Sequence, residues 1–174
     1  MGQLRPVQLV KPIIGIIAST QSALAQAESS VISAWGAIDD KSPCIPFSFS
    51  DYYNAEMGTN LLRRWLSLSQ LISPDTLASM KHTANTIEDS FRGAGKRTVN
   101  IDPGYIALSK LVLASTKDFS HRIYVGNQIY EEITLLFRAN KFIALPWSYA
   151  DYQCDTAMQF LTNARERLKQ QLEK

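Results

Sequence analysis

The chain has 174 residues, a length that suits one domain with a sizeable hydrophobic core. Hydrophobic residues make up 45% of the chain and charged residues 20%, which excludes a disordered chain, a collagen and a coiled coil. Eighteen Lys and Arg against sixteen Asp and Glu leave a net charge of +2, too small for a protein that coats DNA. The longest apolar run, residues 13–18, is far shorter than the roughly 20 residues that cross a bilayer, so we expect no membrane association.

Two cysteines, Cys44 and Cys154, are too few for a disulfide scaffold, and no further Cys or His pair lies at zinc-ligand spacing. We therefore expect free thiols and a cytoplasmic location. The N-terminus shares some features with a secretion signal, because basic residues precede an apolar stretch and residues 23–25 read Ala-Leu-Ala. That stretch is short and opens with Pro12, so a strand followed by a helix is the better interpretation.

Residues 1–10 are polar and weakly patterned, and we expect them to form a loosely ordered lead-in. Residues 13–18 are a continuous apolar run, which predicts a central strand buried on both faces. Ser19, Thr20 and Ser22 are candidate N-caps for a following helix. The apolar residues of this helix recur at helical spacing and are Leu24, Ala27, Val31 and Trp35.

Residues 45–53 alternate with a period of two and predict a strand, whereas the irregular spacing of residues 61–71 predicts a helical turn or an ordered loop. Ser73-Pro74-Asp75 supplies an N-cap, a proline at the first helical position and an acid in the first turn, which together predict a helix. The core face of this helix consists of Leu77, Met80, Ala84, Ile87 and Phe91. We expect Gly93 and Gly95 to end it.

The next part of the chain predicts an antiparallel meander. Asp102-Pro103-Gly104 favours a type II turn between strands at residues 97–102 and 105–114, because Pro presets φ and Gly tolerates positive φ. Gly126-Asn127 is a two-residue hairpin signal between strands at 122–125 and 128–137. A third turn at Ala139-Asn140 leads into residues 142–149.

A final helix begins at about Asp155, with a charged outer face. Its inward residues are Ala157, Phe160, Leu161, Ala164 and Leu168. The predicted fold class is α+β, a mostly antiparallel sheet with about three helices that cover one face. No linker divides the chain, so we expect a single globular domain over residues 1–174.

A seven-residue motif occurs twice, one hundred residues apart. Residues 46–52 read P-F-S-F-S-D-Y and residues 146–152 read P-W-S-Y-A-D-Y. If both are strands, alternation places an aromatic row that ends in a carboxylate, Asp51 or Asp151, on one face of each. One interpretation is that each Asp caps whatever follows its strand. The other is that the two carboxylates meet at one end of the sheet near residues 100–105, where they could bind a metal or serve as acid and base.

Further polar residues lie on the predicted strands of the second half. Lys110 interrupts an apolar strand, where a lone ammonium is costly, and we expect a salt bridge to Glu132 or Asp102. One interpretation of these residues is a solvated sheet face. The other is a pocket for an anion, with its cationic side formed by Arg97, Lys110, Lys117 and Arg122. His121 is a candidate general base or a structural histidine at a strand edge.

Familiar catalytic motifs are absent from the sequence. There is no phosphate-binding P-loop, no nucleophile elbow of a serine hydrolase and no dinucleotide fingerprint. Thr116-Lys117-Asp118 has the wrong spacing for the guanine-reading motif of GTPases.

Five segments together resemble the uncharacterised bacterial domain-of-unknown-function 4416 family. They are F-S-D-Y-Y-N-A-E-M-G (49–58), N-I-D-P-G-Y (100–105), L-V-L-A-S-T-K-D (111–118), H-R-I-Y (121–124) and W-S-Y-A-D-Y (147–152). The resemblance covers nearly the whole chain but implies little about function. Relatives sometimes carry a GTP-binding label, which the missing phosphate loop does not support, and the family has no catalytic residues that could be transferred.

Two hypotheses of function follow. The first is an enzyme or binding protein for a small anionic ligand, such as a nucleotide or a phosphorylated metabolite. Its candidate catalytic residues are Asp51, Asp102, His121 and Asp151, and its candidate ligand-binding residues are Glu56, Asn100, Lys110, Lys117, Arg122 and Glu132. The second is a non-catalytic adaptor or an RNA-associated protein with exposed contact residues Tyr52, Tyr53, Tyr105 and Tyr152. The sequence identifies neither a cofactor nor a metal nor an oligomeric state.

Overall fold

The computed structural model describes residues 2–93 and 95–173, and one antiparallel sheet runs through it. In order across the sheet its main strands are β11 (Lys141–Ala144), β10 (Ile129–Arg138), β8 (Lys110–Ser115), β7 (Val99–Ala107), β1 (Lys11–Ala18), β4 (Leu62–Leu68) and β2 (Ile38–Lys41). Two short strands bring the total to nine, since β3 (Ile45–Pro46) pairs with β4 and β9 (Ile123–Gly126) pairs with β10. A separate small hairpin joins β5 (Arg92–Gly93) and β6 (Lys96–Arg97).

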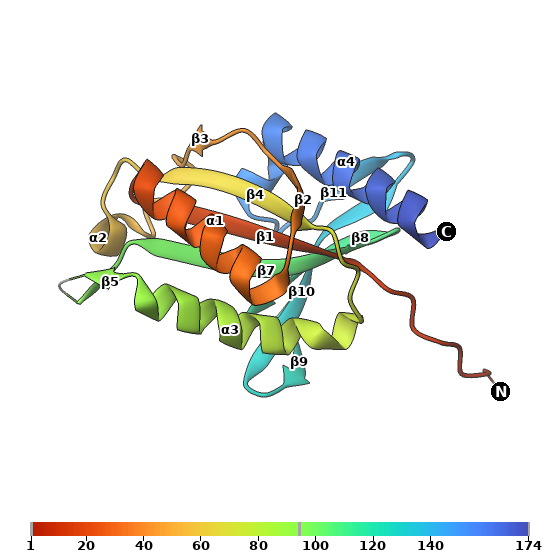
Figure 1. Cartoon of the computed structure of the whole chain (residues 1–174). Coiled ribbons are helices and arrows are strands. Elements are labelled where there is room, and N and C mark those ends of the chain that lie inside the picture. The colour runs from red at the N-terminus through yellow and green to blue at the C-terminus, as the bar shows by residue number, and fades with distance from the viewer. Residues whose placement is uncertain (1, 94, 174) are drawn as a thin grey trace.

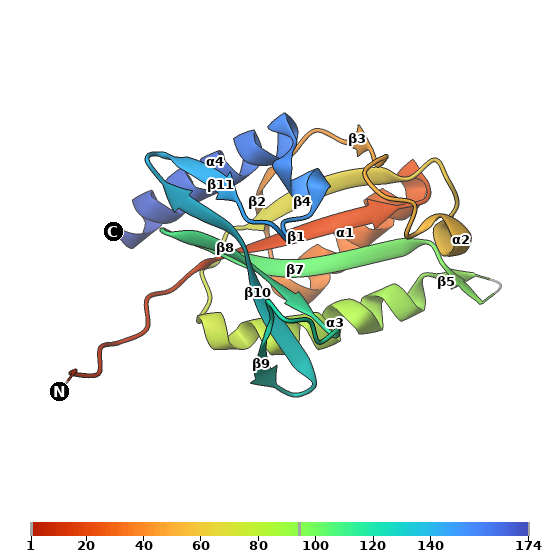
Figure 2. The same cartoon turned by 180° about the vertical axis from the view of Figure 1, so that it is seen from behind.

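Helices cover both faces of this sheet. Helices α1 (Gln21–Trp35) and α3 (Leu77–Ser90) lie in front of it in Figure 1, and the view from behind places the sheet in front of them (Figure 2). Helix α4 (Asp155–Leu172) packs on the other face in a separate core, while α2 (Asn54–Met57) is a single turn. The α+β class is confirmed, but the prediction that the helices cover one face is wrong.

The central strand explains why two layers of helices are needed. Every residue of β1 is buried, and its side chains alternate between the two faces. Ile14 and Ile16 contact the core of α1 and α3, whereas Ile13 belongs to the core of α4. A strand that is apolar on both faces has to be covered on both. The predicted central strand is therefore confirmed.

Local signals correctly predict the three long helices. Thr20 caps α1, with its Oγ1 accepting a hydrogen bond of 3.0 Å from the Ala23 amide. A 3₁₀ turn, η1 (Pro74–Thr76), leads into α3, although the Ser73 side chain makes no capping hydrogen bond. All five predicted inward residues of α4 are buried.

The predictions for residues 45–53 and 61–71 are wrong. Only Ile45 and Pro46 form a strand in the first segment. The Phe47 amide still donates to the Leu61 carbonyl at 2.7 Å, and the chain then leaves the sheet as a loop. In the second segment, β4 is an inner strand between β1 and β2. Its alternation was obscured by Arg63, a charged residue that is 1% exposed on the face of the sheet that α4 partly covers.

The predicted turn at residues 102–104 is also wrong, because β7 runs through it and turns only after Ala107. Strand β8 pairs with β7 only as far as Gly104, so Pro103 lies where no partner strand needs its missing N–H. Gly104 does not have a positive φ; its lack of a side chain instead allows β7 and β8 to approach each other closely. The later hairpins are confirmed. The first one turns at Asn127 and Gln128, one residue later than predicted, because Gly126 still belongs to β9, and the second turns at Ala139 and Asn140 as predicted.

Candidate functional site

A cavity of about 550 Å³ lies on the α4 side of the sheet. Its floor includes Ile17, Arg63 and Asp102, from three adjacent strands. In contrast to Ile13, Ile17 does not pack with α4 but with Phe47, Met57 and Leu61 from the segment between β3 and β4. Loops therefore cover this part of the sheet, and the space between them and the strands is the candidate site.

Both copies of the repeated motif line this cavity. The first copy contributes Phe47, Phe49, Ser50 and Tyr52, and the second contributes Trp147, Tyr149, Ala150, Asp151 and Tyr152. Beyond Pro46 neither copy is a strand, so the prediction of two strands in one sheet is wrong. Each copy instead leaves an edge strand, β3 or β11, and leads into one helical turn, α2 or η2 (Ala150–Gln153). The two copies thus meet at one cavity as loops.

The two repeated aspartates lie in different environments, and neither is on a strand. Asp51 is exposed and does not line the cavity, and its Oδ1 accepts a hydrogen bond of 2.7 Å from the Asn54 side chain. Asp151 is buried and lines the cavity, with its Oδ2 2.9 Å from Arg63 Nη2. The hypothesis of paired carboxylates at one strand end is therefore wrong, because each carboxylate has its own partner.

Arg63 lines the cavity although the sequence did not indicate it. Its guanidinium lies 4.7 Å from the ring centre of Trp65 and 5.1 Å from that of Tyr152, in addition to its ion pair with Asp151. Burial raises the pKa of Asp151 above its ordinary value of 3.8, although the charge of Arg63 opposes this. Two other nitrogens of Arg63, Nε and Nη1, have no hydrogen-bond acceptor in the described part of the chain.

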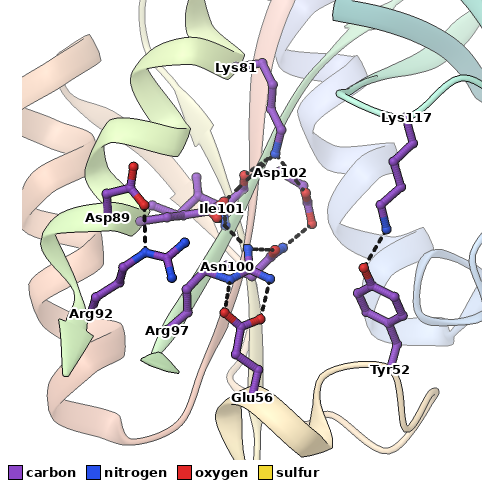
Figure 3. A network of polar contacts seen from close by, with 11 residues as sticks. Tyr52, Glu56, Lys81, Asp89, Arg92, Arg97, Asn100, Ile101, Asp102 and Lys117 are labelled. Atoms are coloured by element: carbon purple, nitrogen blue, oxygen red, sulfur yellow. Dashed lines mark hydrogen bonds and ion pairs between the residues drawn. The ribbon is translucent and has the colours of Figure 1, made fainter. Parts of the chain in front are cut away.

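Helix α3 completes the edge of β7 where β8 no longer pairs with it (Figure 3). Lys81 Nζ donates to the Ile101 carbonyl at 3.0 Å, and Glu88 Oε1 accepts from the Ile101 amide at 2.8 Å. These two side chains replace the backbone of a missing strand. Lys81 Nζ also lies 3.4 Å from Asp102 Oδ1, and Asn100 donates to Asp102 Oδ2 at 2.7 Å.

Arg97 links this group to helix α2 (Figure 3). It binds both carboxylate oxygens of Glu56 at 2.9 Å and Glu88 Oε2 at 2.7 Å. The hydrogen bonds from Arg97 hold the pKa of Glu56 below its ordinary value of 4.5, whereas burial raises that of Glu88. Glu56 does not line the cavity, so its role in the structure is to position Arg97.

A second polar group surrounds Glu132 on β10. This buried carboxylate lies 2.8 Å from Arg122 Nε and 3.2 Å from His121 Nε2. Arg122 also donates to the Tyr149 hydroxyl at 2.7 Å, which joins this group to the second copy of the motif. The His121 ring stacks on Trp147, with ring centres 5.2 Å apart.

Lys117 and Lys110 differ in their surroundings. Lys117 lies at the cavity and donates to the Tyr52 hydroxyl at 2.6 Å (Figure 3). Lys110 does not line the cavity, and it makes no ion pair within the described residues. The prediction of a salt bridge for Lys110 is therefore wrong. The carboxylates nominated for Lys110 are bound instead by Lys81 and Arg122.

Seven of the ten predicted site residues line the cavity: Asn100, Asp102, Lys117, His121, Arg122, Glu132 and Asp151. The three that do not are Asp51, Glu56 and Lys110. Lys81 and Glu88 were missed although a signal was present. They fall at helical spacing with the buried Leu77 and Ala84, and a charge on an apolar stripe indicates a buried partner.

Within residues 2–93 and 95–173, no group of three or more His, Cys, Asp or Glu side chains is arranged to hold a metal ion. The described helices include none that is long and apolar enough to cross a membrane. The side chains that line the cavity are mainly charged groups and aromatic rings.

Comparison with known proteins assigns this chain to a protein family. The model of the family called domain of unknown function DUF4416 matches residues 8–168. The chain belongs to this family, and the resemblance seen in its motifs is confirmed. No curated protein and no solved structure matched the chain in the corresponding searches.

Proposed function

We propose that the protein binds a small anionic molecule in this cavity, as a binding protein or as an enzyme. The volume of about 550 Å³ falls within the range of small-molecule pockets, about 300–1,000 Å³. The cavity lies between segments that are distant in sequence and carries both charged groups and aromatic rings. A few convergent polar groups in an otherwise apolar cleft are typical of a ligand site.

The balance of charge in the cavity carries the proposal. Five Lys or Arg side chains and four Asp or Glu side chains line it. Each lining carboxylate has a cationic partner: Asp151 has Arg63, Asp102 has Lys81, Glu88 has Arg97, and Glu132 has Arg122. Lys117 is the lining cation for which the described residues supply no carboxylate within ion-pair distance. Its charge, placed beside a recess, favours a negatively charged ligand.

The aromatic side chains at the cavity support a ligand with a planar or apolar part. Tyr52, Phe119 and Tyr149 keep between 44% and 63% of their surface exposed although they line the recess. Exposed rings of this size are costly to leave in water and gain by stacking on a ligand. These three rings and the charge of Lys117 together favour a ligand that has an anionic group and a flat body.

A thermal-shift screen against nucleotides, phosphorylated metabolites and carboxylic acids tests the proposal. A ligand at 100 times its Kd adds about 2.7 kcal/mol of stability, which corresponds to a rise of several degrees in Tm. The response is expected to weaken in Lys117→Ala and to persist in Lys41→Ala, a change at an exposed lysine on β2 outside the cavity. A panel without any stabilising compound, or equal responses of both variants, would count against the proposal.

The alternative of a non-catalytic adaptor or RNA-associated protein has less support. Of the four tyrosines expected to be exposed, Tyr105 is 7% exposed and Tyr152 is 2% exposed, so neither offers a stacking surface. Four of the five cations at the cavity also bind carboxylates rather than facing solvent alone. We further propose that the protein acts in the bacterial cytoplasm, which the free thiols of Cys44 and Cys154 support.

A further inference from the structure

Buried hydrogen-bond donors without acceptors gather at the floor of the cavity. Arg63 Nε and Nη1 and the Tyr152 hydroxyl have no partner among the described residues, and both side chains line the cavity. Arg63 is 1% exposed and Tyr152 is 2% exposed, so bulk water does not satisfy them. A buried donor without a partner costs about 1–3 kcal/mol. Such groups are uncommon in native proteins and require a reason.

Gly15 brings these groups together. A Cβ at this position would lie 2.7 Å from Arg63 Nη2 and 2.8 Å from Tyr152 Oη, so a larger residue would force these side chains to move. The guanidinium and the hydroxyl therefore converge above the backbone of β1. Trp65 packs beside them, with its ring centre 5.7 Å from that of Tyr152 and its Nε1 also without a described partner. The cluster therefore holds an Arg63 guanidinium with two unpartnered nitrogens and, close to its Nη2, a Tyr152 hydroxyl without a partner among the described residues.

We propose that Arg63 and Tyr152 bind the carboxylate of a ligand whose planar, apolar body stacks among the aromatic side chains of the two repeated segments, an inference that rests on the proposed function of the cavity. A guanidinium fork matches the two oxygens of a carboxylate, and a phenolic O–H adds a third hydrogen bond. The charge balance selects a monoanion. Asp151 pairs with Arg63, so the one cation that exceeds the carboxylates of the lining is Lys117. A ligand with one negative charge balances the cavity as a whole, whereas a phosphate dianion would remain half neutralised.

Titration of the ¹⁵N-labelled protein with three matched probes tests this inference. Phenylacetate supplies a carboxylate on a planar ring, phenyl phosphate a dianion above its second pKa of about 6, and benzyl alcohol no charge. We expect phenylacetate to bind most tightly and to shift the Arg63 Nε–H resonance. Tighter binding of phenyl phosphate or of benzyl alcohol would overturn the carboxylate assignment.

The variant Tyr152→Phe separates binding from folding. It removes only a hydroxyl that has no partner, so the free protein should be as stable as the wild type or more so. Its affinity for phenylacetate should nevertheless fall about tenfold, the effect of losing one hydrogen bond to a charged group. Tyr124→Phe, on the exposed edge strand β9, is the matched control and should bind as the wild type does.

The outcomes distinguish this inference from the proposed function. Unchanged affinity in Tyr152→Phe would overturn the subsite, even if phenylacetate binds elsewhere in the cavity. Stabilisation by a phosphorylated compound alone would overturn the subsite and leave the proposed function supported. If neither the three probes nor the wider panel binds, both fail.

Discussion

Gly104 shows how the absence of one side chain determines a strand contact. A Cβ at this position would meet the backbone oxygen of Val112 and would lie 2.5 Å from Leu113 Cδ2. The glycine has no positive φ, so its role is to let β7 and β8 approach each other closely. The sequence correctly marks this residue as special but gives the wrong reason, because Pro-Gly occurs both in turns and at such close approaches.

We therefore expect Gly104→Ala to destabilise the fold by about 1–3 kcal/mol, the range for overpacking at a site where a backbone atom has to move. Denaturant unfolding measures this change. Gly93→Ala is the matched control, because a Cβ at Gly93 meets no atom within 4 Å. Equal stability of the two variants would contradict the close approach.

Helix α3 acts as a substitute strand for β7. The Ile101 amide donates to Glu88 Oε1 rather than to a neighbouring strand, and the Ile101 carbonyl accepts from Lys81. Since successive residues of a strand direct their backbone groups to opposite sides, those of Asn100 and Asp102 face β1. The hydrogen bond of the Ile101 amide therefore depends on one side chain of α3, that of Glu88.

Native-state hydrogen exchange tests this arrangement at single-residue resolution. In Glu88→Ala, we expect the Ile101 amide to lose protection, while the amides of Asn100 and Asp102 keep theirs because β1 still pairs with them. Asp89→Ala changes the neighbouring exposed carboxylate and should leave all three amides protected. Loss of protection along the whole strand would instead indicate that Glu88 supports the packing of α3.

Elements that depend on local signals were predictable, and elements that depend on distant partners were not. Thr20 and the apolar spacing after it specify α1 without reference to the rest of the chain. Strand β4 was missed because Arg63 and Ser67, which share a face with Trp65, are polar although they are buried. Their burial depends on groups such as Asp151 and Asp39, which lie far away in the sequence. The period-two alternation in residues 45–53 was misleading for a related reason. Its aromatic rings line the cavity and pack over Ile17 of β1 from a loop, not from a strand of the sheet.

The candidate site was partly predictable for the same reason. Polar residues at strand ends, such as Asn100 and Lys117, could be recognised as unusual from the sequence and do line the cavity. The position of Lys110 on an apolar strand gave an equally strong signal, but its side chain has no described ion-pair partner and lies outside the cavity. Only tertiary contacts separate these two cases.

The ion pair of Arg63 and Asp151 connects two distant parts of the chain, the inner strand β4 and the turn that precedes α4. Asp151→Asn should destabilise the protein by about 3–5 kcal/mol, because it leaves a buried guanidinium without an anion. Adding Arg63→Met to this variant should recover much of the loss, because no uncompensated charge then remains buried. Denaturant unfolding of the two single variants and the double variant measures the coupling between the residues.

The exposed pair of Arg92 and Asp89 is the matched control for this cycle. Its side chains are 47% and 65% exposed, and such pairs contribute about 0–1 kcal/mol. We expect Arg92→Met and Asp89→Asn to show little coupling. A coupling for Arg63 and Asp151 as small as that of this pair would show that the buried charges do not depend on each other.

The position of β1 between β4 and β7 also has a consequence for synthesis of the chain. Both strands that pair with β1 are made after it, and β7 is complete only at Ala107. At roughly 5–20 residues per second, the apolar segment Ile13–Ala18 therefore emerges several seconds before β7 can cover its second edge. During this interval it is an exposed hydrophobic strand of the kind that aggregates or binds chaperones. A strand that is completely buried in the folded protein is thus exposed until both of its partner strands have been made.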